Sequence, residues 1–427
     1  MTDAIHRREF IGRTAFGAAA AGLATSAIGR ADDKPSQRVV VGVMGMSRGR
    51  SLATQFAQQA GVEVRYVCDV DSKRAGTAAE AVEKTGAAKP QAIGDFQQIL
   101  DDDEVDALVC AAPNHWHAPA TILACAAGKH VYVEKPCSQN PREGEMMVEA
   151  ARKYRRAVQM GTQRRSGPKV IAAMELLHSG EIGRVYASRA YHSGARGTIG
   201  KGKPADVPEN LNYDLWQGPA PRVPYVDNRV HYNWHWLWHW GNGELGNNGV
   251  HTLDLCRWGL DADYPIRVTS NGGRYRFDDD QQTPDTHNVS FEFEDRKMVT
   301  WQGMSCNRHN SDFVVFYGEK GSLELTGSGH YTVYDAADKV VRSENGTRGD
   351  TEHIVDFLSA IRDDKPTRLN AEIEEGHKST LLCHLGNIAQ RTGRTLNCDA
   401  RSGHIIGDPK AMTLWQRDYE PGWEPRV

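Results

Sequence analysis

Lys135 and His251 are the two side chains in this sequence best suited to moving a proton. Lys135 follows the apolar run 131–134, which is typical of a buried strand, so it stands at the sheet edge where such folds bind ligands. A partly desolvated lysine can act as an acid or a base, and a neutral imidazole can take a proton from a hydroxyl group. The structural alternatives are a solvated lysine and a hydrogen-bonded core histidine.

Residues 231–240 contain four tryptophans and three histidines. Aromatic faces beside hydrogen-bonding groups suit a carbohydrate, which presents C–H faces and hydroxyl edges. Two of the histidines could bind zinc if the stretch were helical, but no cysteine or acidic partner lies nearby in the sequence, so we predict no metal. The other alternative is aromatic packing between two lobes. The residues of this stretch expected to bind substrate are Trp234, His235, Trp238 and His239.

A glycine-rich turn lies between the apolar run 39–44 and a helical pattern over 50–60. Such a turn presents backbone N–H groups and a helix N-terminus to a pyrophosphate, although Ser replaces the second glycine of the usual fingerprint. Asp69 ends the next strand-like run and can accept hydrogen bonds from both ribose hydroxyls; otherwise it is a turn residue. No Arg or Lys follows until Lys73, so NAD is favoured over NADP. The residues of the turn expected to bind the cofactor are Gly45, Ser47, Arg48 and Gly49.

These residues require an alternation of strands and helices to position them. Strand-like runs at 39–44, 62–68, 105–111 and 131–134 alternate with helical patterns, which predicts a parallel sheet covered by helices on both faces. The pattern changes after residue 160, where β-rich stretches become frequent. We therefore expect three parts after the N-terminal segment: a doubly wound Rossmann domain over 36–160, an α+β domain over 161–400, and a tail over 401–427.

The composition excludes several classes of protein. The chain has 427 residues, of which 39% are hydrophobic and 25% charged, with a net charge of −4. This is a globular composition without the basic character of a nucleic-acid-binding protein. It contains no apolar run of 18 residues, so we expect no membrane span once a signal is removed. No C-x-x-C pair occurs among the eight cysteines, which argues against a structural zinc site.

The first 31 residues resemble a twin-arginine (Tat) export signal. Arg7 and Arg8 are adjacent, Phe10 follows, and residues 14–29 are rich in Ala and Gly. We therefore expect a periplasmic or otherwise exported protein that folds, and takes up its cofactor, before export. An amphipathic N-terminal helix is the alternative.

Several ordered motifs resemble the Gfo/Idh/MocA oxidoreductases, the relatives of glucose–fructose oxidoreductase and inositol dehydrogenase. The Glu134-Lys135-Pro136 triplet after a strand is the hallmark, and the resemblance covers residues 38–400. It implies a second domain with a large, mostly antiparallel open sheet, through which a homodimer or homotetramer forms. It also implies that Lys135 and His251 take part in proton transfer. The further cofactor-binding residues that it implies are Pro113, Asn114, His117, Glu134 and Lys135.

The residue four places before His251 departs from the family pattern, which often has Asp there. Asn247 cannot relay a proton, so we expect it to orient His251 or to bind a hydroxyl group. Asp254 can either interact with His251 on the same helix face or serve as a structural ion pair. We also expect a cleft edge that contacts substrate, although a solvated arginine pair is the alternative for part of it. The residues of this edge are Gln163, Arg164 and Trp216.

Three functions remain open from the sequence. The first is an exported NAD-dependent oxidoreductase that acts on a hydroxyl of a sugar or sugar derivative, with tightly bound NAD. The second is an NAD-dependent glycoside hydrolase or lyase, which oxidises the ring transiently and eliminates the aglycone. The third is a sugar- or nucleotide-binding protein without catalysis, against which Lys135 and His251 argue.

Overall fold

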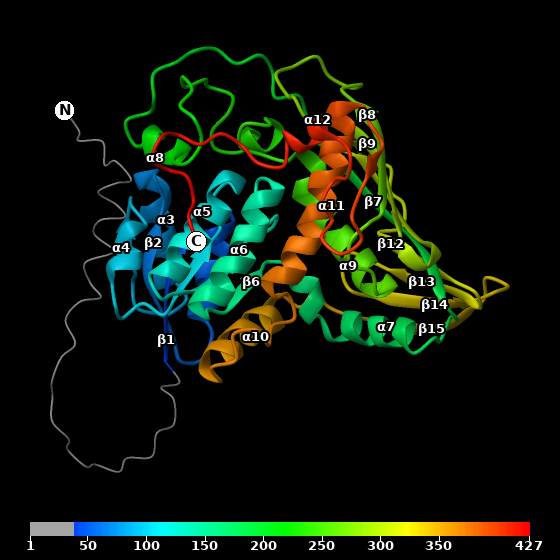
Figure 1. Cartoon of the computed structure of the whole chain (residues 1–427). Helices are drawn as coiled ribbons and strands as arrows, with labels where there is room; N and C mark the ends of the chain where they lie inside the picture. The colour runs from blue at the N-terminus through cyan, green and yellow to red at the C-terminus, as the bar shows by residue number, and fades with distance from the viewer. Residues whose placement is uncertain (1–37) are drawn as a thin grey trace, which may run out of the picture.

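The computed structural model describes residues 38–427, and the signal expected at 1–31 lies outside them. Its first half is a six-stranded parallel sheet in the order β3-β2-β1-β4-β5-β6, the doubly wound arrangement that the alternation predicted. Helices cover both faces of this sheet (Figure 1). The strands are β1 Val39–Met44, β2 Val62–Cys68, β3 Gln91–Ile93, β4 Ala107–Cys110, β5 His130–Val133 and β6 Val158–Met160.

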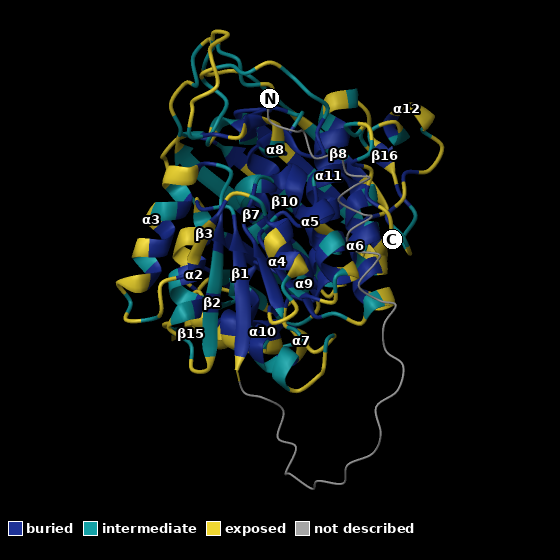
Figure 2. Cartoon of the chain, turned by 90° about the vertical axis from the view of Figure 1, so that its left-hand side faces the viewer, coloured by how far each residue is buried: buried dark blue, intermediate teal, exposed yellow. Residues whose placement is uncertain are grey.

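A helix from the far end of the chain completes one face of the sheet. Helix α10, Asp350–Arg362, packs with α2, Arg48–Ala57, and α3, Ser72–Glu83. Phe357 of α10 makes edge-to-face contacts with Phe56 and Tyr132. The opposite face is covered by α4, Gln97–Asp101, α5, Asn114–Ala126, and α6, Pro141–Tyr154. All six residues of β1 are buried, as its continuous apolar run predicted (Figure 2).

The second half is built on a ten-stranded sheet in the order β15-β14-β13-β12-β7-β10-β9-β8-β16, with β11 paired to β7. Only β7 and β10 pair in parallel, so the sheet is mostly antiparallel as expected. The strands are β7 Val185–Ala195, β8 Arg267–Gly273, β9 Thr286–Phe293, β10 Lys297–Met304, β11 Cys306–Asn307, β12 Val314–Gly318, β13 Gly321–Leu325, β14 Tyr331–Asp335, β15 Val340–Glu344 and β16 Leu396–Asn397.

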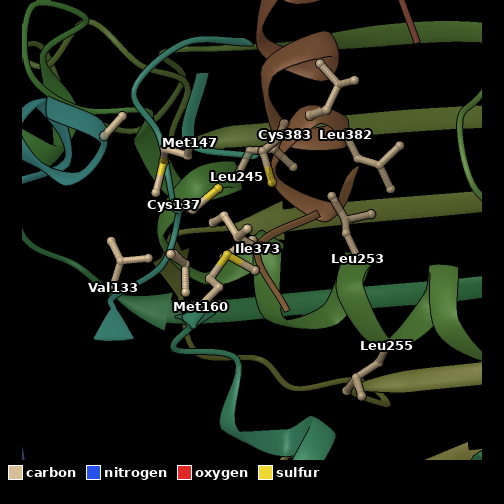
Figure 3. Packing of buried hydrophobic residues seen from close by; sticks show 14 of the residues in the cluster. Val133, Cys137, Met147, Met160, Leu245, Leu253, Leu255, Ile373, Leu382 and Cys383 are labelled. Atoms are coloured by element: carbon tan, nitrogen blue, oxygen red, sulfur yellow. The ribbon is translucent and has the colours of Figure 1, made fainter. Parts of the chain in front are cut away.

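Three helices lie along one face of this sheet. They are α7, Pro168–His178, α9, Val250–Leu260, and α11, Ile373–Thr392 (Figure 1). One hydrophobic cluster runs from the first sheet through α11 and α9 to the second sheet. Figure 3 shows Val133 and Met160 of the first sheet beside Ile373 and Cys383 of α11 in this cluster. The two sheets are therefore held by one continuous core, which fixes the cleft between them.

Residues 205–242 cross back from the second half over the first, and we call them the crossing segment. They contain α8, Tyr213–Gln217, and a short 3-10 helix, Asn233–Trp236. Figure 1 shows this segment above the first sheet, with the C-terminal tail beside it after α12, Pro409–Met412. In the described part of the chain no helix is long and apolar enough to cross a membrane. The eight cysteines all lie there and are unpaired.

Candidate active site

A pocket of about 280 Å³ lies between the edge of the first sheet, the crossing segment and the start of α9. It brings together side chains from residues 44 to 251, so most of the predicted site residues meet in one cavity. Gly49, Arg164, Trp238 and His239 do not line it. The predicted residues that do are Gly45, Ser47, Arg48, Asp69, Pro113, Asn114, His117, Glu134, Lys135, Gln163, Trp216, Trp234, His235, Asn247 and His251.

The turn after β1 has the geometry of a nucleotide-binding loop. Gly45 has φ +89°, and a Cβ there would lie 2.5 Å from the Ala111 carbonyl oxygen, so only glycine fits. Gly49 is buried in the first turn of α2 and donates its N–H to the Gly45 carbonyl at 3.1 Å. Because the helix begins directly after the turn, its N-terminus points backbone N–H groups toward the pocket.

Asp69 stands at the end of β2 beside this turn. Its carboxylate accepts hydrogen bonds from the backbone N–H of Met46 at 2.7 Å and of Asp71 at 2.9 Å. Arg74 approaches it at 3.6 Å. The carboxylate is thus fixed against the glycine turn, and it lines the pocket where a ribose would be held. The glycine turn and this carboxylate together fit a dinucleotide cofactor.

The residues after β4 and β5 tie the pocket walls together. The His117 ring nitrogens lie 2.6 Å from the Pro136 carbonyl oxygen and 2.7 Å from that of Ala112. These two contacts fix the His117 ring as part of the pocket wall. Burial lowers the pKa of His117. The Asn114 amide donates to Asn242 at 2.8 Å, which links the first sheet to the second half of the chain.

Glu134 and Arg48 form an ion pair on the pocket wall. Arg48 Nε lies 3.2 Å from Glu134 Oε1, and Arg48 Nη2 lies 3.4 Å from Asp350 at the start of α10. Gln163 also donates to Asp350, at 3.4 Å. Arg48, which the sequence placed in the glycine turn, is therefore held by carboxylates from two distant elements.

Lys135 is bound to Asn247, which lies 112 residues away. Its Nζ donates to the Asn247 backbone oxygen at 2.7 Å and to the Asn247 Oδ1 at 3.2 Å. Burial lowers the pKa of Lys135, against the opposing effect of Glu134 and Glu244. Asn247 lies in a π-helical turn, Leu245–Gly249, that leads into α9. The bond of Asn247 is thus to the lysine, whereas the sequence suggested an orienting role toward the histidine.

His251 lies in the first turn of α9 and faces the same pocket. Its Nδ1 atom is buried and has no hydrogen-bond partner among the described residues. Burial, and then the positive charges of Arg164 and Lys135, hold the pKa of His251 well below its ordinary value. The imidazole is therefore neutral near pH 7, and because Nδ1 is shielded, Nε2 is the ring nitrogen that can meet a ligand in the pocket.

Asp254 is a structural residue, one of the two roles that the sequence left open. Both of its carboxylate oxygens lie 2.9 Å from Arg165 Nε, and Ser379 donates to it at 2.7 Å. This buried pair joins α9 to α11 and to the segment after β6. His251, three residues earlier, lies on the same side of α9, so the helix is fixed close to the imidazole.

The four predicted residues outside the pocket wall have other partners. Gly49 donates its N–H to the Gly45 carbonyl. The Arg164 guanidinium donates to the Gly327 carbonyl at 3.0 Å and lies over the Phe313 ring at 4.9 Å. The Trp238 ring lies 4.8 Å from the Arg391 guanidinium. The His239 ring contacts the Pro221 carbonyl at 2.9 Å.

The aromatic stretch is mostly not helical, so its histidines do not share one face. His231 contacts Asp71, His235 contacts the Tyr232 carbonyl, and His239 contacts Pro221. Within residues 38–427 no group of His, Cys, Asp and Glu is arranged to hold a metal ion. The Trp234 and His235 rings stack at 3.6 Å and line the pocket together.

Sequence reasoning missed other residues of the pocket wall, because they are recruited by long-range contacts. His231 and Tyr232 line the pocket although they were not among the expected ligands. Arg196, from the end of β7, donates to the Tyr232 hydroxyl at 2.7 Å and pairs with buried Glu244. No local motif predicts this arrangement, because Arg196 and Glu244 lie 48 residues apart in the sequence.

Comparison with known families agrees with this geometry. Residues 37–162 match the Gfo/Idh/MocA profile described as "Oxidoreductase family, NAD-binding Rossmann fold". Residues 190–424 match its "C-terminal alpha/beta domain" profile. The chain belongs to the Gfo/Idh/MocA family of NAD-dependent oxidoreductases. Its first half is accordingly an NAD-binding domain, as predicted.

The curated relatives are distant. A Shewanella "Glycosyl hydrolase family 109 protein 1" is 27% identical over 44% of this chain and 45% of its own length. A Salmonella typhimurium inositol 2-dehydrogenase is 29% identical over 42% and 51%. The chain thus spans about half the length of these relatives. Levoglucosan dehydrogenase, solved with NADH and levoglucosan, shares the fold at a TM-score of 0.65 and 18% identity, over 84% of this chain and 99% of its own.

Proposed function

We propose that this protein oxidises a hydroxyl-bearing carbon of a sugar or sugar derivative, or reduces the corresponding carbonyl, using NAD that stays bound. The observation that carries the proposal is the neutral His251 imidazole, which lines the same pocket as the Lys135 ammonium group. A hydroxyl group between them would meet one acceptor and one donor. The names of several relatives and structural neighbours, inositol 2-dehydrogenase and levoglucosan dehydrogenase among them, support a polyhydroxylated substrate.

NAD, when bound, supplies the acceptor for the hydride that leaves the carbon. The residues fitted to hold it are those of the Gly45 turn, Asp69 and Glu134. His251 takes the hydroxyl proton on the ring nitrogen that faces the pocket, because its imidazole is neutral. Lys135 Nζ donates to the substrate oxygen and stabilises negative charge there as the proton leaves. Asn247 holds that ammonium group in place through two acceptor oxygens.

The test uses the purified protein with no NAD added. Free sugars and sugar derivatives should reduce the bound cofactor, which is followed by its absorbance. His251→Asn should retain NAD but reduce it much more slowly, since the base is lost. His309→Asn, at an exposed histidine, is the matched control and should behave as the parent. Equal rates for the parent and His251→Asn would contradict the role of His251.

A redox-neutral glycosidase is the second candidate, favoured by the glycosyl hydrolase and alpha-N-acetylgalactosaminidase relatives. In that reaction the ring hydroxyl is oxidised, the neighbouring C–H becomes acidic, the aglycone is eliminated, water adds, and the hydride returns. Aryl glycosides distinguish the two candidates. Release of the aglycone without net reduction of NAD would support the glycosidase, and net reduction without aglycone release would support the oxidoreductase.

Export through the twin-arginine route is part of the proposal. Arg7 and Arg8 support it, together with the Ala- and Gly-rich stretch that follows. Outside the cytoplasm a lost cofactor has no pool from which to be replaced, so an exported enzyme must keep its NAD. A double Arg7→Lys, Arg8→Lys variant should accumulate inside the cell, as measured by fractionation and immunoblotting. Unchanged export would indicate another route.

A further inference from the structure

The crossing segment forms the side of the pocket that faces the nucleotide-binding domain. Leu215, Trp216, His231 and Trp234 line the pocket together with Asp69, Val70 and Arg74. All four come from outside residues 37–162, the range matched by the NAD-binding profile. The half of the pocket expected to hold the nucleotide therefore has a second wall, supplied by the other domain.

Backbone contacts fasten this wall beside Asp69. The Asn212 N–H donates to the Val70 carbonyl at 2.9 Å, and the Ser72 N–H donates to the Asn210 carbonyl at 3.0 Å. Between them, Asp71 and Leu211 form an antiparallel bridge. A three-residue stretch after β2 is thus paired like a short strand with the crossing segment.

A side-chain contact from the crossing segment also reaches residues 70–72. His231 Nε2 lies 3.0 Å from Asp71 Oδ2. The other Asp71 oxygen caps α3, accepting from the backbone N–H groups of Lys73 and Arg74. Asp71 thus joins the end of β2, the start of α3 and the crossing segment at one carboxylate.

A second anchor lies at α5. The Trp216 carbonyl oxygen is 2.9 Å from His115 Nε2, and Trp116 Nε1 donates to it at 3.1 Å. The C-terminal tail reinforces this end, because Glu420 accepts from the Arg222 N–H at 3.0 Å. The segment is therefore fixed to the first domain on both sides of the pocket.

The wall has a small hydrophobic core of its own, so it is a built element and not an open loop. Val70, from the end of β2, packs against this core. Its buried members are Leu211, Tyr213, Trp216, Ala220, Trp234, Leu237 and Trp240.

We propose that the crossing segment is a clamp that retains NAD, and that the His231–Asp71 contact and the Trp216 anchor set how slowly the cofactor leaves. This inference rests on the bound NAD of the proposed function and names the residues responsible. It assigns Trp216 and His231 to cofactor retention, whereas the sequence suggested that Trp216 edges the substrate cleft and that the aromatic stretch containing His231 binds the sugar. The cofactor can leave only when the clamp detaches from residues 70–72 and from α5.

The test measures the rate at which NADH dissociates from the intact protein after loading, with excess unlabelled NAD present as competitor. His231→Asn should speed dissociation about tenfold, the factor that corresponds to about 1.4 kcal/mol. Trp216→Leu, which leaves the backbone carbonyl but removes packing, should do the same through the other anchor. His239→Asn is the matched control, because this histidine bonds Pro221 within the crossing segment and does not line the pocket.

Each outcome is decisive. Slow release from the parent and the control, with faster release from both variants of unchanged melting temperature, supports the clamp. Equal release rates from parent and variants would overturn it and assign retention to the first domain. Loss of NAD from the parent on a gel-filtration column would also overturn it. In both of those cases sugar oxidation with added NAD would still support the oxidoreductase, so the two proposals fail separately.

Discussion

The two ends of the pocket satisfy their polar groups in opposite ways. At the nucleotide end, the carboxylates of Asp69 and Asp71 are held by backbone N–H groups. At the other end, the buried Nδ1 of His251 has no partner among the described residues, and Lys135 is held by one asparagine. A group that must bind benefits from fixed partners, whereas a group that must exchange a proton needs an open position. One end of the cavity is therefore suited to binding the cofactor, and the other end is suited to proton transfer.

The same contrast appears in the charges. Burial and neighbouring cations depress the pKa of His251, and burial depresses that of Lys135, so both are shifted toward their neutral forms. Perturbed groups in a cleft are typical of active sites, although structural networks perturb pKa values too. Changes at one end should therefore alter rate, and changes at the other should alter cofactor binding.

The largest expected effect is at the reacting end. Lys135→Met should lower the rate of hydride transfer by about a hundred- to ten-thousand-fold, because a positioned proton donor is lost. NAD content should be unchanged. Lys129→Met is the matched control, since that buried lysine binds the Asp102 carbonyl away from the pocket. If Lys135→Met lost bound NAD as well as activity, the assignment of binding and proton transfer to different ends of the pocket would be wrong.

The next effect is at the holding end. Asp69→Asn should weaken NAD binding by about 2–4 kcal/mol, roughly thirty- to several-hundred-fold in Kd, because charge-assisted hydrogen bonds are lost. The rate with saturating NAD should change little. Calorimetric titration of the cofactor-free protein with NAD measures the change in Kd. Asp106→Asn is the control, because this carboxylate also binds a β1 backbone N–H, of Val40, but does not line the pocket.

Asn247→Asp should produce a smaller and more specific change. A carboxylate 3.2 Å from Lys135 Nζ favours the ammonium form, so the pKa of Lys135 rises. The limb of the pH–rate profile due to Lys135 should therefore move to higher pH by about one unit or more. Asn288→Asp, at an exposed asparagine of β9 away from the pocket, is the control. A profile identical to the parent would show that Asn247 does not neighbour the titrating group.

Away from the pocket, buried histidines should make the fold acid-sensitive. Burial lowers the pKa of His384 to about 3, whereas in the unfolded chain it titrates near 6.5. Since the unfolded state binds the proton first, stability falls as pH drops below about 6.5, by up to about 1.4 kcal/mol per pH unit. His384→Gln should flatten this dependence in denaturant titrations. His309→Gln, at an exposed site, should not.

Four of the six strands in the first half were predictable because each is a short, mostly apolar run, whereas the three-residue strands β3 and β6 were not predicted. Boundaries moved by a few residues, as at β4, which covers Ala107–Cys110 where 105–111 was expected. In the second half the frequent β-rich stretches predicted a sheet, but nothing in the sequence predicted β14 and β15. Val340 and Val341 of exposed β15 lack the alternation that marks a half-buried strand.

The site was predictable where motifs carry it and not where tertiary contacts do. The glycine turn, Asp69, Lys135 and His251 were found from type and position, and they meet in one pocket. The His231–Asp71 contact joins residues that lie 160 positions apart, so the local sequence around either residue does not predict it. The same holds for Asn247, whose partner lies 112 residues away.

The order in which the chain is synthesised gives the crossing segment a further consequence. Strands β1 to β6 leave the ribosome first, residues 210–234 follow, and the tail that holds Arg222 through Glu420 comes last. The nucleotide-binding domain therefore emerges before the segment that forms the second wall of its pocket, and the bond from Arg222 to Glu420 is added later still. A nascent chain that ends before residue 205 therefore lacks one wall of this pocket, which places full retention of the cofactor after synthesis of the crossing segment.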